Sequence, residues 1–344
     1  MGRFLLRDGN GKRPTLLASR LNAQLLSGRP ARSAEAATER LLAIQGQDPR
    51  GFRLAIRART KGLHVSDVDR ALTEDRSLLV TWLNRGTLHL VRSEDYPLVQ
   101  AVTTPPLRTS SARRLAQEGF PPRDAERGVR AIEKALADEG PLPSDDLRKR
   151  LVAAGVPAQG QALYHLLFKA SLEGLVVRGP MVGKRHAYVL VRDWLGEQKP
   201  VNRDEALPEF ARRYLAGHAP ADDRDLARWA GIPLRDARAG LTAIADGASG
   251  RAGRSPELPP PKLFGAFEPC LLGWDSRADI VGDGPKNLVT VGGMFYPFAM
   301  VGGRAVARWK LVNGELELDA FRRIAKADRD ALERDAADVE RFLG

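Results

Sequence analysis

Residues 175–191, LVVRGPMVGKRHAYVLV, place two apolar, β-branched runs on either side of a glycine-flanked turn. This pattern predicts a β-hairpin. Three helical patterns precede the hairpin, one around Ile132, one capped by Ser144 and one over residues 159–173. Three helices followed by a two-stranded wing are the order of a winged helix-turn-helix, so we predict this fold for residues 119–200.

The N-terminal part of the chain repeats this order. Its sequence predicts helices at 14–26, from Ser33 to about Ile44, after residue 48 and from Ser66 to Leu72, then strands at 78–83 and 87–91, and further helix over 94–118. Trp82 in this hairpin is expected to be a core residue. Residues 203–246 predict a third helical unit that lacks a wing.

Beyond residue 256 the chain becomes rich in short strand patterns. We expect strands at 263–267, 279–281, 288–291, 298–301, 305–309 and 316–318, which suggest a small barrel or a curled sheet. Asn313-Gly314 is a strong signal for a two-residue hairpin turn. A closing helix is expected to bury Leu332, Ala336, Val339 and Leu343 on one face.

These patterns predict an α+β protein of tandem winged helix-turn-helix units followed by a small β-barrel-like module. The expected parts are an N-terminal winged-helix unit (1–118), a second winged-helix unit (119–200), a third helix-turn-helix unit (201–255) and the β module with its closing helix (256–344).

The charge of the chain points to a polyanionic partner. Lys and Arg number 54 and Asp and Glu 43, so the net charge is +11 and the pI is about 10.1. Nucleic acid is favoured over a membrane surface, although a generally arginine-rich proteome would also account for the excess. Cys270 is the only cysteine, and the five histidines have no metal-type spacing, so we expect no disulfide, metal or cofactor. With no signal-peptide or membrane-spanning pattern, we expect a cytoplasmic, nucleoid-associated protein.

One short turn between two predicted helices stands out chemically. In Ile44-Gln45-Gly46-Gln47-Asp48-Pro49-Arg50, Asp48 is placed to cap the next helix and Pro49 to occupy its first position. Such a turn would present Gln45 and Gln47 on the same side of the chain. Neutral amides supply hydrogen-bond donors and acceptors without changing charge, so they can orient water or a base. A turn with a purely capping role is the alternative.

Four stretches of this chain resemble, in order, motifs of the AlkZ-type bacterial DNA glycosylases: residues 41–49 with the glutamine turn, 82–91 with Arg-Gly-Thr-Leu-His, 225–231 and 272–275. The resemblance covers essentially the whole chain. It implies a monofunctional glycosylase that removes N7-alkylated or bulky adducted purines, in some members from interstrand crosslinks. It also implies that Gln45 and Gln47 line the active site, in the Gln-x-Gln rather than the Gln-x-Asp branch.

The implied chemistry suits neutral amides. Cleavage of an N-glycosidic bond passes through an oxocarbenium-like sugar, and an N7-alkylated guanine is already a cationic leaving group that needs no general acid. Gln47 would then hold the attacking water and Gln45 would contact the sugar or the base. Asp48 and His89 are candidates for assistance, with helix capping and core packing as their alternatives.

Bulky lesions cannot be swung into a closed pocket as a flipped base can. We therefore expect an open, C-shaped basic cradle for double-stranded DNA. The turns 282–286 and 302–304 are candidates for a probing hairpin, with a role as simple connections as the alternative. The candidate DNA contacts are Arg50, Arg53, Arg57, Arg85, His165, Lys169, Lys184, Arg185, Lys286 and Arg304. A monomer is expected. A non-catalytic winged-helix protein, acting as a regulator or a lesion-sequestering factor, is the competing hypothesis.

Overall fold

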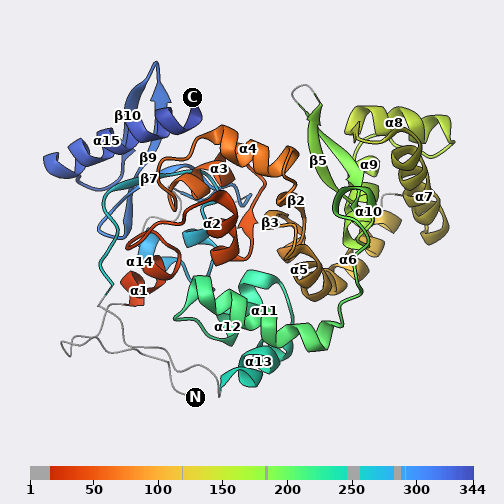
Figure 1. Cartoon of the computed structure of the whole chain (residues 1–344), viewed down its shortest axis with the longest axis horizontal. Helices are drawn as coiled ribbons and strands as arrows, with labels where there is room; N and C mark the ends of the chain where they lie inside the picture. The colour runs from red at the N-terminus through yellow and green to blue at the C-terminus, as the bar shows by residue number, and fades with distance from the viewer. Residues whose placement is uncertain (1–15, 118, 183–184, 246–255, 283–287, 291) are drawn as a thin grey trace. The chain divides into compact units, whose positions relative to one another are not determined.

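The computed structural model describes residues 16–117, 119–182, 185–245, 256–282, 288–290 and 292–344 (Figure 1). The chain forms two compact units. The first combines Met1–Val68 with Leu207–Gly344, and the second is Asp69–Ala206. The predicted parts 1–118, 119–200, 201–255 and 256–344 divide the chain differently from these two units, and that finer division stays a prediction.

The first unit joins N-terminal helices to the C-terminal module. Its elements are α1 (Leu16–Ala23), α2 (Ala34–Leu41), β1 (Ile44–Gln45), α3 (Pro49–Arg57), the start of α4 (Val65–Thr73), most of α11 (Arg203–His218), α12 (Asp223–Ala230), α13 (Leu234–Ala243), β7 (Lys262–Phe264), the 3-10 turn η3 (Pro269–Leu271), α14 (Ala278–Val281), β8 (Phe298–Val301), β9 (Arg304–Val312), β10 (Glu315–Ala320) and α15 (Lys326–Leu343). No helix in the described ranges is long and apolar enough to cross a membrane.

The C-terminal strands form one antiparallel sheet in the order β10-β9-β8-β7, and α15 packs against β7 (Figure 1). Asn313 and Gly314 both have positive φ, and Val312 pairs with Glu315, which confirms the predicted hairpin. The barrel expectation is wrong for the described residues, because this sheet ends at β10 and β7 without closing.

Three details of this module also differ from the sequence predictions. Residues 279–281 belong to the helix α14, and Val289 forms only an isolated bridge with Phe295. In α15, Phe342 takes the buried position expected for Leu343. Runs of three or four residues are too short to show a period, so tertiary packing decides their conformation.

The second unit contains the end of α4, β2 (Leu78–Trp82), the 3-10 turn η1 (Asn84–Gly86), β3 (Leu88–Arg92), α5 (Tyr96–Thr103), α6 (Pro105–Gln117), α7 (Pro122–Glu139), β4 (Leu142–Pro143), α8 (Ser144–Ala153), α9 (Ala162–Leu172), β5 (Val176–Val182), β6 (Arg185–Leu190), α10 (Val191–Leu195) and the first residues of α11. Both predicted hairpins are present, and they join in one sheet whose order within this unit is β3-β2-β5-β6-β4. Trp82 stacks on Tyr188 and meets the edges of Tyr164 and Phe168, which confirms it as core.

Several predicted helix ends are corrected. Helix α2 begins after its cap Ser33, whose hydroxyl accepts from the Ala36 N–H, but it ends at Leu41 because Leu42 turns to φ 63°. Ile44 therefore lies in the short strand β1 rather than at the end of a helix. Ser144 is the first residue of α8 rather than its cap, and α4 begins at Val65, before Ser66.

Candidate active site

The glutamine turn has the local geometry that its sequence predicts. Asp48 is extended, its Oδ1 accepts from the Arg50 N–H at 3.0 Å, and Pro49 opens α3. These two residues fix the direction in which the chain enters the helix. Gln45, Gly46 and Gln47 are thereby held between β1 and the capped end of α3.

The two glutamines are directly bonded to each other. Gln45 is 7% exposed and its Nε2 donates to Gln47 Oε1 at 2.5 Å, whereas the Gln47 side chain is exposed. The Gln45 amide is thus buried and bonded to Gln47, whose own amide faces solvent. A carbonyl oxygen has two lone pairs, so this bond occupies only part of the accepting capacity of Gln47.

Helix α3 is seated tightly on the C-terminal module at its first turn. A Cβ on Gly51 would lie 2.4 Å from the Ala266 carbonyl oxygen, and a Cβ on Gly265 would lie 2.8 Å from Gly51 Cα. Glycine is needed at both positions because the two backbones touch. The segment 263–268 therefore sets the position of the helix that carries the glutamine turn.

Arg57, predicted as a DNA contact, instead anchors the other end of α3. Its buried guanidinium donates to Asp335 Oδ2 at 2.9 Å, Asp338 Oδ2 at 3.1 Å and the Leu263 carbonyl at 2.8 Å. This corrects the expectation that Arg57 contacts DNA. An arginine that is desolvated and bound to two carboxylates has a structural role.

A second buried ion pair lies beside this helix. Arg59 Nη2 donates to Glu268 Oε1 at 2.6 Å and to Gln24 Oε1 at 3.0 Å, and the Arg59 and Glu268 side chains are fully buried. Sequence reasoning missed this ion pair because Arg59 and Glu268 are 209 residues apart.

Two motifs of the family resemblance also prove to be structural within the first unit. Asp225 Oδ1 accepts from the Asp275 N–H at 2.9 Å, and its Oδ2 accepts from Arg20 at 2.8 Å. Trp274 Nε1 donates to the His218 carbonyl at 2.9 Å. The stretches 225–231 and 272–275 thus hold each other in place.

His89 and Arg85 belong to the second unit. His89 is 1% exposed and its ring Nδ1 lies 3.0 Å from the Thr87 carbonyl, so Nδ1 carries the proton that it donates. Burial, reinforced by the positive charge of Arg85, lowers the pKa of His89 to about 3. At neutral pH the imidazole is uncharged and cannot act as a general acid. Arg85 itself is half-buried in the turn η1 with φ 57°.

The other predicted DNA contacts have varied surroundings. Arg50 is exposed, with its guanidinium over the Trp309 ring, and Arg53 lies over Phe52 and donates to the Pro49 carbonyl. Arg304 is exposed just after the β8–β9 turn.

In the second unit, Arg185 pairs with Asp145, Lys169 pairs with Glu173, and the His165 ring meets that of Tyr164. Two predicted contacts, Lys184 and Lys286, lie outside the described residues. Most of the turn 282–286, which contains Lys286, lies outside them as well.

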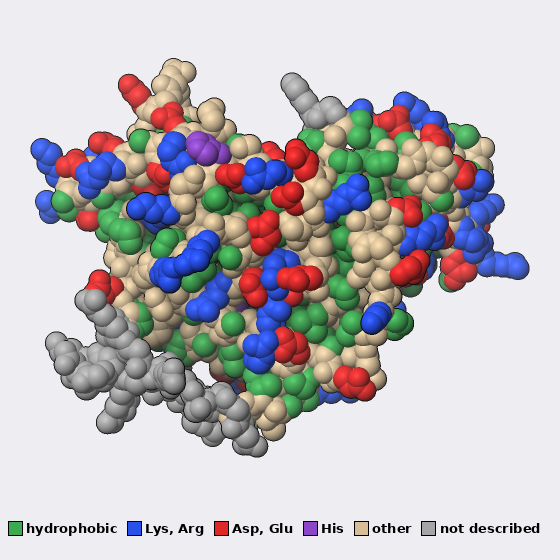
Figure 2. Space-filling model, viewed as in Figure 1, with side chains coloured by type: hydrophobic (Ala, Val, Ile, Leu, Met, Phe, Trp, Pro, Cys, Tyr) green, Lys and Arg blue, Asp and Glu red, His purple; other side chains and the backbone are tan. Residues whose placement is uncertain are grey.

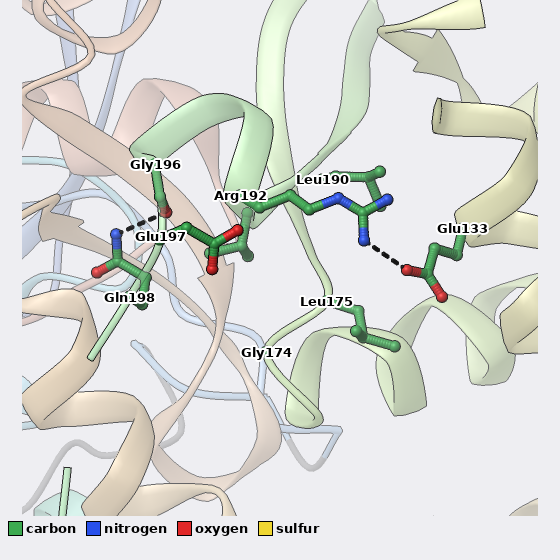
Figure 3. A pocket seen from close by; sticks show the side chains of 9 residues that line it. Glu133, Gly174, Leu175, Leu190, Arg192, Gly196, Glu197 and Gln198 are labelled. Atoms are coloured by element: carbon green, nitrogen blue, oxygen red, sulfur yellow. Dashed lines mark hydrogen bonds and ion pairs between the residues drawn. The ribbon is translucent and has the colours of Figure 1, made fainter. Parts of the chain in front are cut away.

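A small pocket in the second unit contains neither Gln45 nor Gln47. It measures about 200 Å³ and is lined by Glu133, Gly174, Leu175, Leu190, Val191, Arg192, Gly196, Glu197 and Gln198. Figure 3 shows Arg192 bound to Glu133 and Gln198 bound to the Gly196 carbonyl.

Charged side chains of both signs are interspersed over the face shown in Figure 2. In the part of the chain that the structure describes, no group of three or more His, Cys, Asp or Glu side chains is arranged to hold a metal ion.

Comparison with known proteins defines the class. Residues 38–342 match the AlkZ-like DNA glycosylase family, and the chain belongs to that family. It is similar to the interstrand DNA cross-link repair glycosylase of Streptomyces sahachiroi, with 27% identity over 362 aligned positions that cover 96% of each chain.

The solved structure of Streptomyces sahachiroi DNA glycosylase AlkZ has the same fold. It matches with a TM-score of 0.80 over 95% of each chain at 24% identity. The α+β class and the family resemblance noted in the sequence are thus confirmed.

Proposed function

We propose that this protein is a monofunctional DNA glycosylase that hydrolyses the N-glycosidic bond of N7-alkylated or bulky adducted purines in duplex DNA. Its substrates extend to interstrand crosslinks, which it unhooks. The observation that carries the proposal is the bonded amide pair Gln45–Gln47 on a capped turn, in a chain that belongs to a DNA glycosylase family.

Each glutamine has its own role in this mechanism. Gln45 orients Gln47 through the Nε2–Oε1 bond, and the second lone pair of Gln47 Oε1 accepts a hydrogen bond from the attacking water, which releases its proton to the solvent after it bonds to the sugar carbon. Water is then positioned at the sugar carbon while the cationic base departs with the electron pair of the glycosidic bond. Asp48 adds a negative charge near the developing oxocarbenium ion. No lysine is assigned as a nucleophile, so no lyase step follows.

We also propose that the DNA is held by winged-helix units. The order α7-β4-α8-α9-β5-β6, with β4 and β5 both paired to β6, supports a winged helix over this segment. Arg50, Arg53, Arg85, Arg185 and Arg304 stay proposed phosphate contacts, as do Lys184 and Lys286. The C-shaped cradle, the probing hairpin, the monomeric state and the nucleoid location stay predictions.

The test is base release from duplexes that each carry one defined lesion, from 7-methylguanine to a large intercalating adduct and a crosslink. We expect free modified base and abasic sites that break only under alkali. Gln47→Ala should lower the single-turnover rate about 100-fold, the scale of one lost positioning contact, without weakening DNA binding. Gln45→Ala should lower it less, because Gln47 keeps its carbonyl.

Gln198→Ala is the matched control, since this amide also bonds within its own loop but lies in the second unit. It should leave the rate unchanged. Full activity in the Gln45→Ala, Gln47→Ala double variant would contradict the mechanism. Tight binding of every lesion without any base release would favour the non-catalytic alternative.

A further inference from the structure

We propose that Arg50, held in place by the Trp309 ring, binds the DNA phosphate next to the damaged nucleotide and thereby places the sugar of that nucleotide at Gln47. Trp309 is a positioning residue in this role, since it acts on the DNA only through Arg50. The inference rests on the proposed function for its substrate, and it assigns one of the proposed phosphate contacts to a single phosphate.

The three arginines of α3 have different surroundings. Arg57 is buried and bound to two carboxylates, and Arg53 donates to a carbonyl of its own helix. Arg50 is exposed, and its Cζ lies 5.8 Å from the centroid of the Trp309 ring. In the part of the chain that the structure describes, no acid forms an ion pair with it. A guanidinium that rests over an aromatic ring keeps its in-plane N–H donors for a phosphate.

Trp309 is itself fixed where it meets Arg50. Its side chain is 6% exposed, and its Nε1 donates to the Phe264 carbonyl at 2.8 Å. Trp309 lies on β9 and Phe264 on β7, so this bond links the two strands across β8. The ring therefore offers the guanidinium a surface that is part of the packed sheet.

The backbone of Arg50 is also held, on both sides. Gly51 follows it in α3, and a Cβ there would lie 2.4 Å from the Ala266 carbonyl oxygen. In the other direction, the Arg50 N–H donates to Asp48 Oδ1 at 3.0 Å. Both the backbone and the guanidinium of Arg50 are therefore fixed relative to the turn that carries Gln47.

A fixed guanidinium three residues after Gln47 suits the phosphate beside the scissile bond. The sugar of the damaged nucleotide carries a phosphate on each side, so holding one of them places the sugar carbon relative to the attacking water. An arginine that is ordered before DNA binds also loses less side-chain entropy on binding. Loss of Arg50 should therefore slow base release as well as weaken binding.

The experiment uses the full-length protein and duplexes with one 7-methylguanine, in which each nearby phosphate is replaced in turn by a neutral methylphosphonate. We expect one flanking replacement to slow single-turnover base release about tenfold, the scale of one hydrogen bond to a charged group. Arg50→Gln should cause the same loss on the unreplaced duplex and should make the protein insensitive to that replacement. Arg50→Lys should recover only part of the rate, because lysine lacks the planar fork of arginine.

Trp309→Leu tests the positioning role without a change of charge. It should slow base release about threefold when Arg50 is present and cause no further loss in Arg50→Gln, whereas a merely structural effect would slow both proteins equally. The control is Arg329→Gln on α15, which removes an exposed arginine of the same unit and should leave the rate unchanged. The Arg50 measurements do not depend on how well the Trp309 variant folds.

Three outcomes would overturn the proposal: a full rate in Arg50→Gln, an Arg50→Gln protein as sensitive to the flanking replacement as the unmodified protein, or equal losses from Trp309→Leu in both backgrounds. If the unmodified protein releases no base, the proposed function fails, and binding to the same duplexes then tests this inference alone. Arg50→Gln should reduce the slope of log K against log salt by about 0.9, the contribution of one phosphate contact, and an unchanged slope would refute the contact.

Discussion

The two motif glutamines show how strongly neighbouring residues can differ in role. Gln45 is buried and donates, whereas Gln47 is exposed and accepts, although one glycine separates them. The same contrast holds for the basic residues of α3, where Arg50 is exposed and Arg57 is buried against two carboxylates. Residue type and spacing alone do not distinguish a reactive side chain from a structural one.

Buried histidines should make stability depend on pH. Burial lowers the pKa of His218 to about 3, below the value of about 6.5 of an unfolded chain, so the unfolded state binds more protons between these limits. The stabilisation is complete above pH 6.5 and is lost as the pH falls toward 3. His218 should contribute up to about 1.4 kcal/mol per pH unit in this window.

Urea unfolding at pH 7, 6 and 5 measures this slope. His218→Gln should lower stability overall but flatten the pH dependence. The control is His64→Gln at an exposed position, which should keep the slope of the unmodified protein. A slope that is the same in His218→Gln would show that other groups cause the pH dependence.

At the scale of elements, α3 connects the candidate site to distant sequence. The backbone contact of Gly51 with Ala266 holds its first turn, and Arg57 holds its last. The position of the glutamine turn therefore depends on residues of the C-terminal module, within the same compact unit.

Gly51→Ala tests this dependence. Alanine in a helix is favoured over glycine by about 1 kcal/mol, but here its Cβ would lie 2.4 Å from the Ala266 oxygen. We expect the clash to win, with a net destabilisation of about 1–3 kcal/mol and at least a tenfold slower base release.

The measurements are urea unfolding and single-turnover excision on one lesion. Gly292→Ala is the control, because the nearest atom to its added Cβ is Thr290 Oγ1 at 3.8 Å. A Gly51→Ala protein that is more stable and fully active would show that the backbone contact does not position the turn.

At the scale of the whole molecule, the charge of +11 is less concentrated than the total suggests. Many surface cations face acids at i,i+3 or i,i+4 positions, such as Arg212 with Glu209 and Arg341 with Asp338. Binding to undamaged DNA should therefore depend on how the excess cations are distributed over the surface and not on the net charge alone.

The sequence by itself determined the features that depend on near neighbours. The caps Ser33 and Asp48, the Asn313-Gly314 turn and both hairpins of the second unit follow from residues a few positions apart, because capping and turn formation are local interactions. The family motifs added the class of the protein.

Only the tertiary structure decided which of these residues face solvent. Arg57 meets Asp335 across 278 positions, and α6 packs against α9, although neither contact follows from a local pattern. Tertiary packing also decided that the C-terminal strands form an open sheet, because the sequence of a strand does not determine which strands it pairs with. Burial is a property of the packed chain. An arginine in a buried ion pair and an arginine that contacts DNA look the same in the sequence, and only burial distinguishes them.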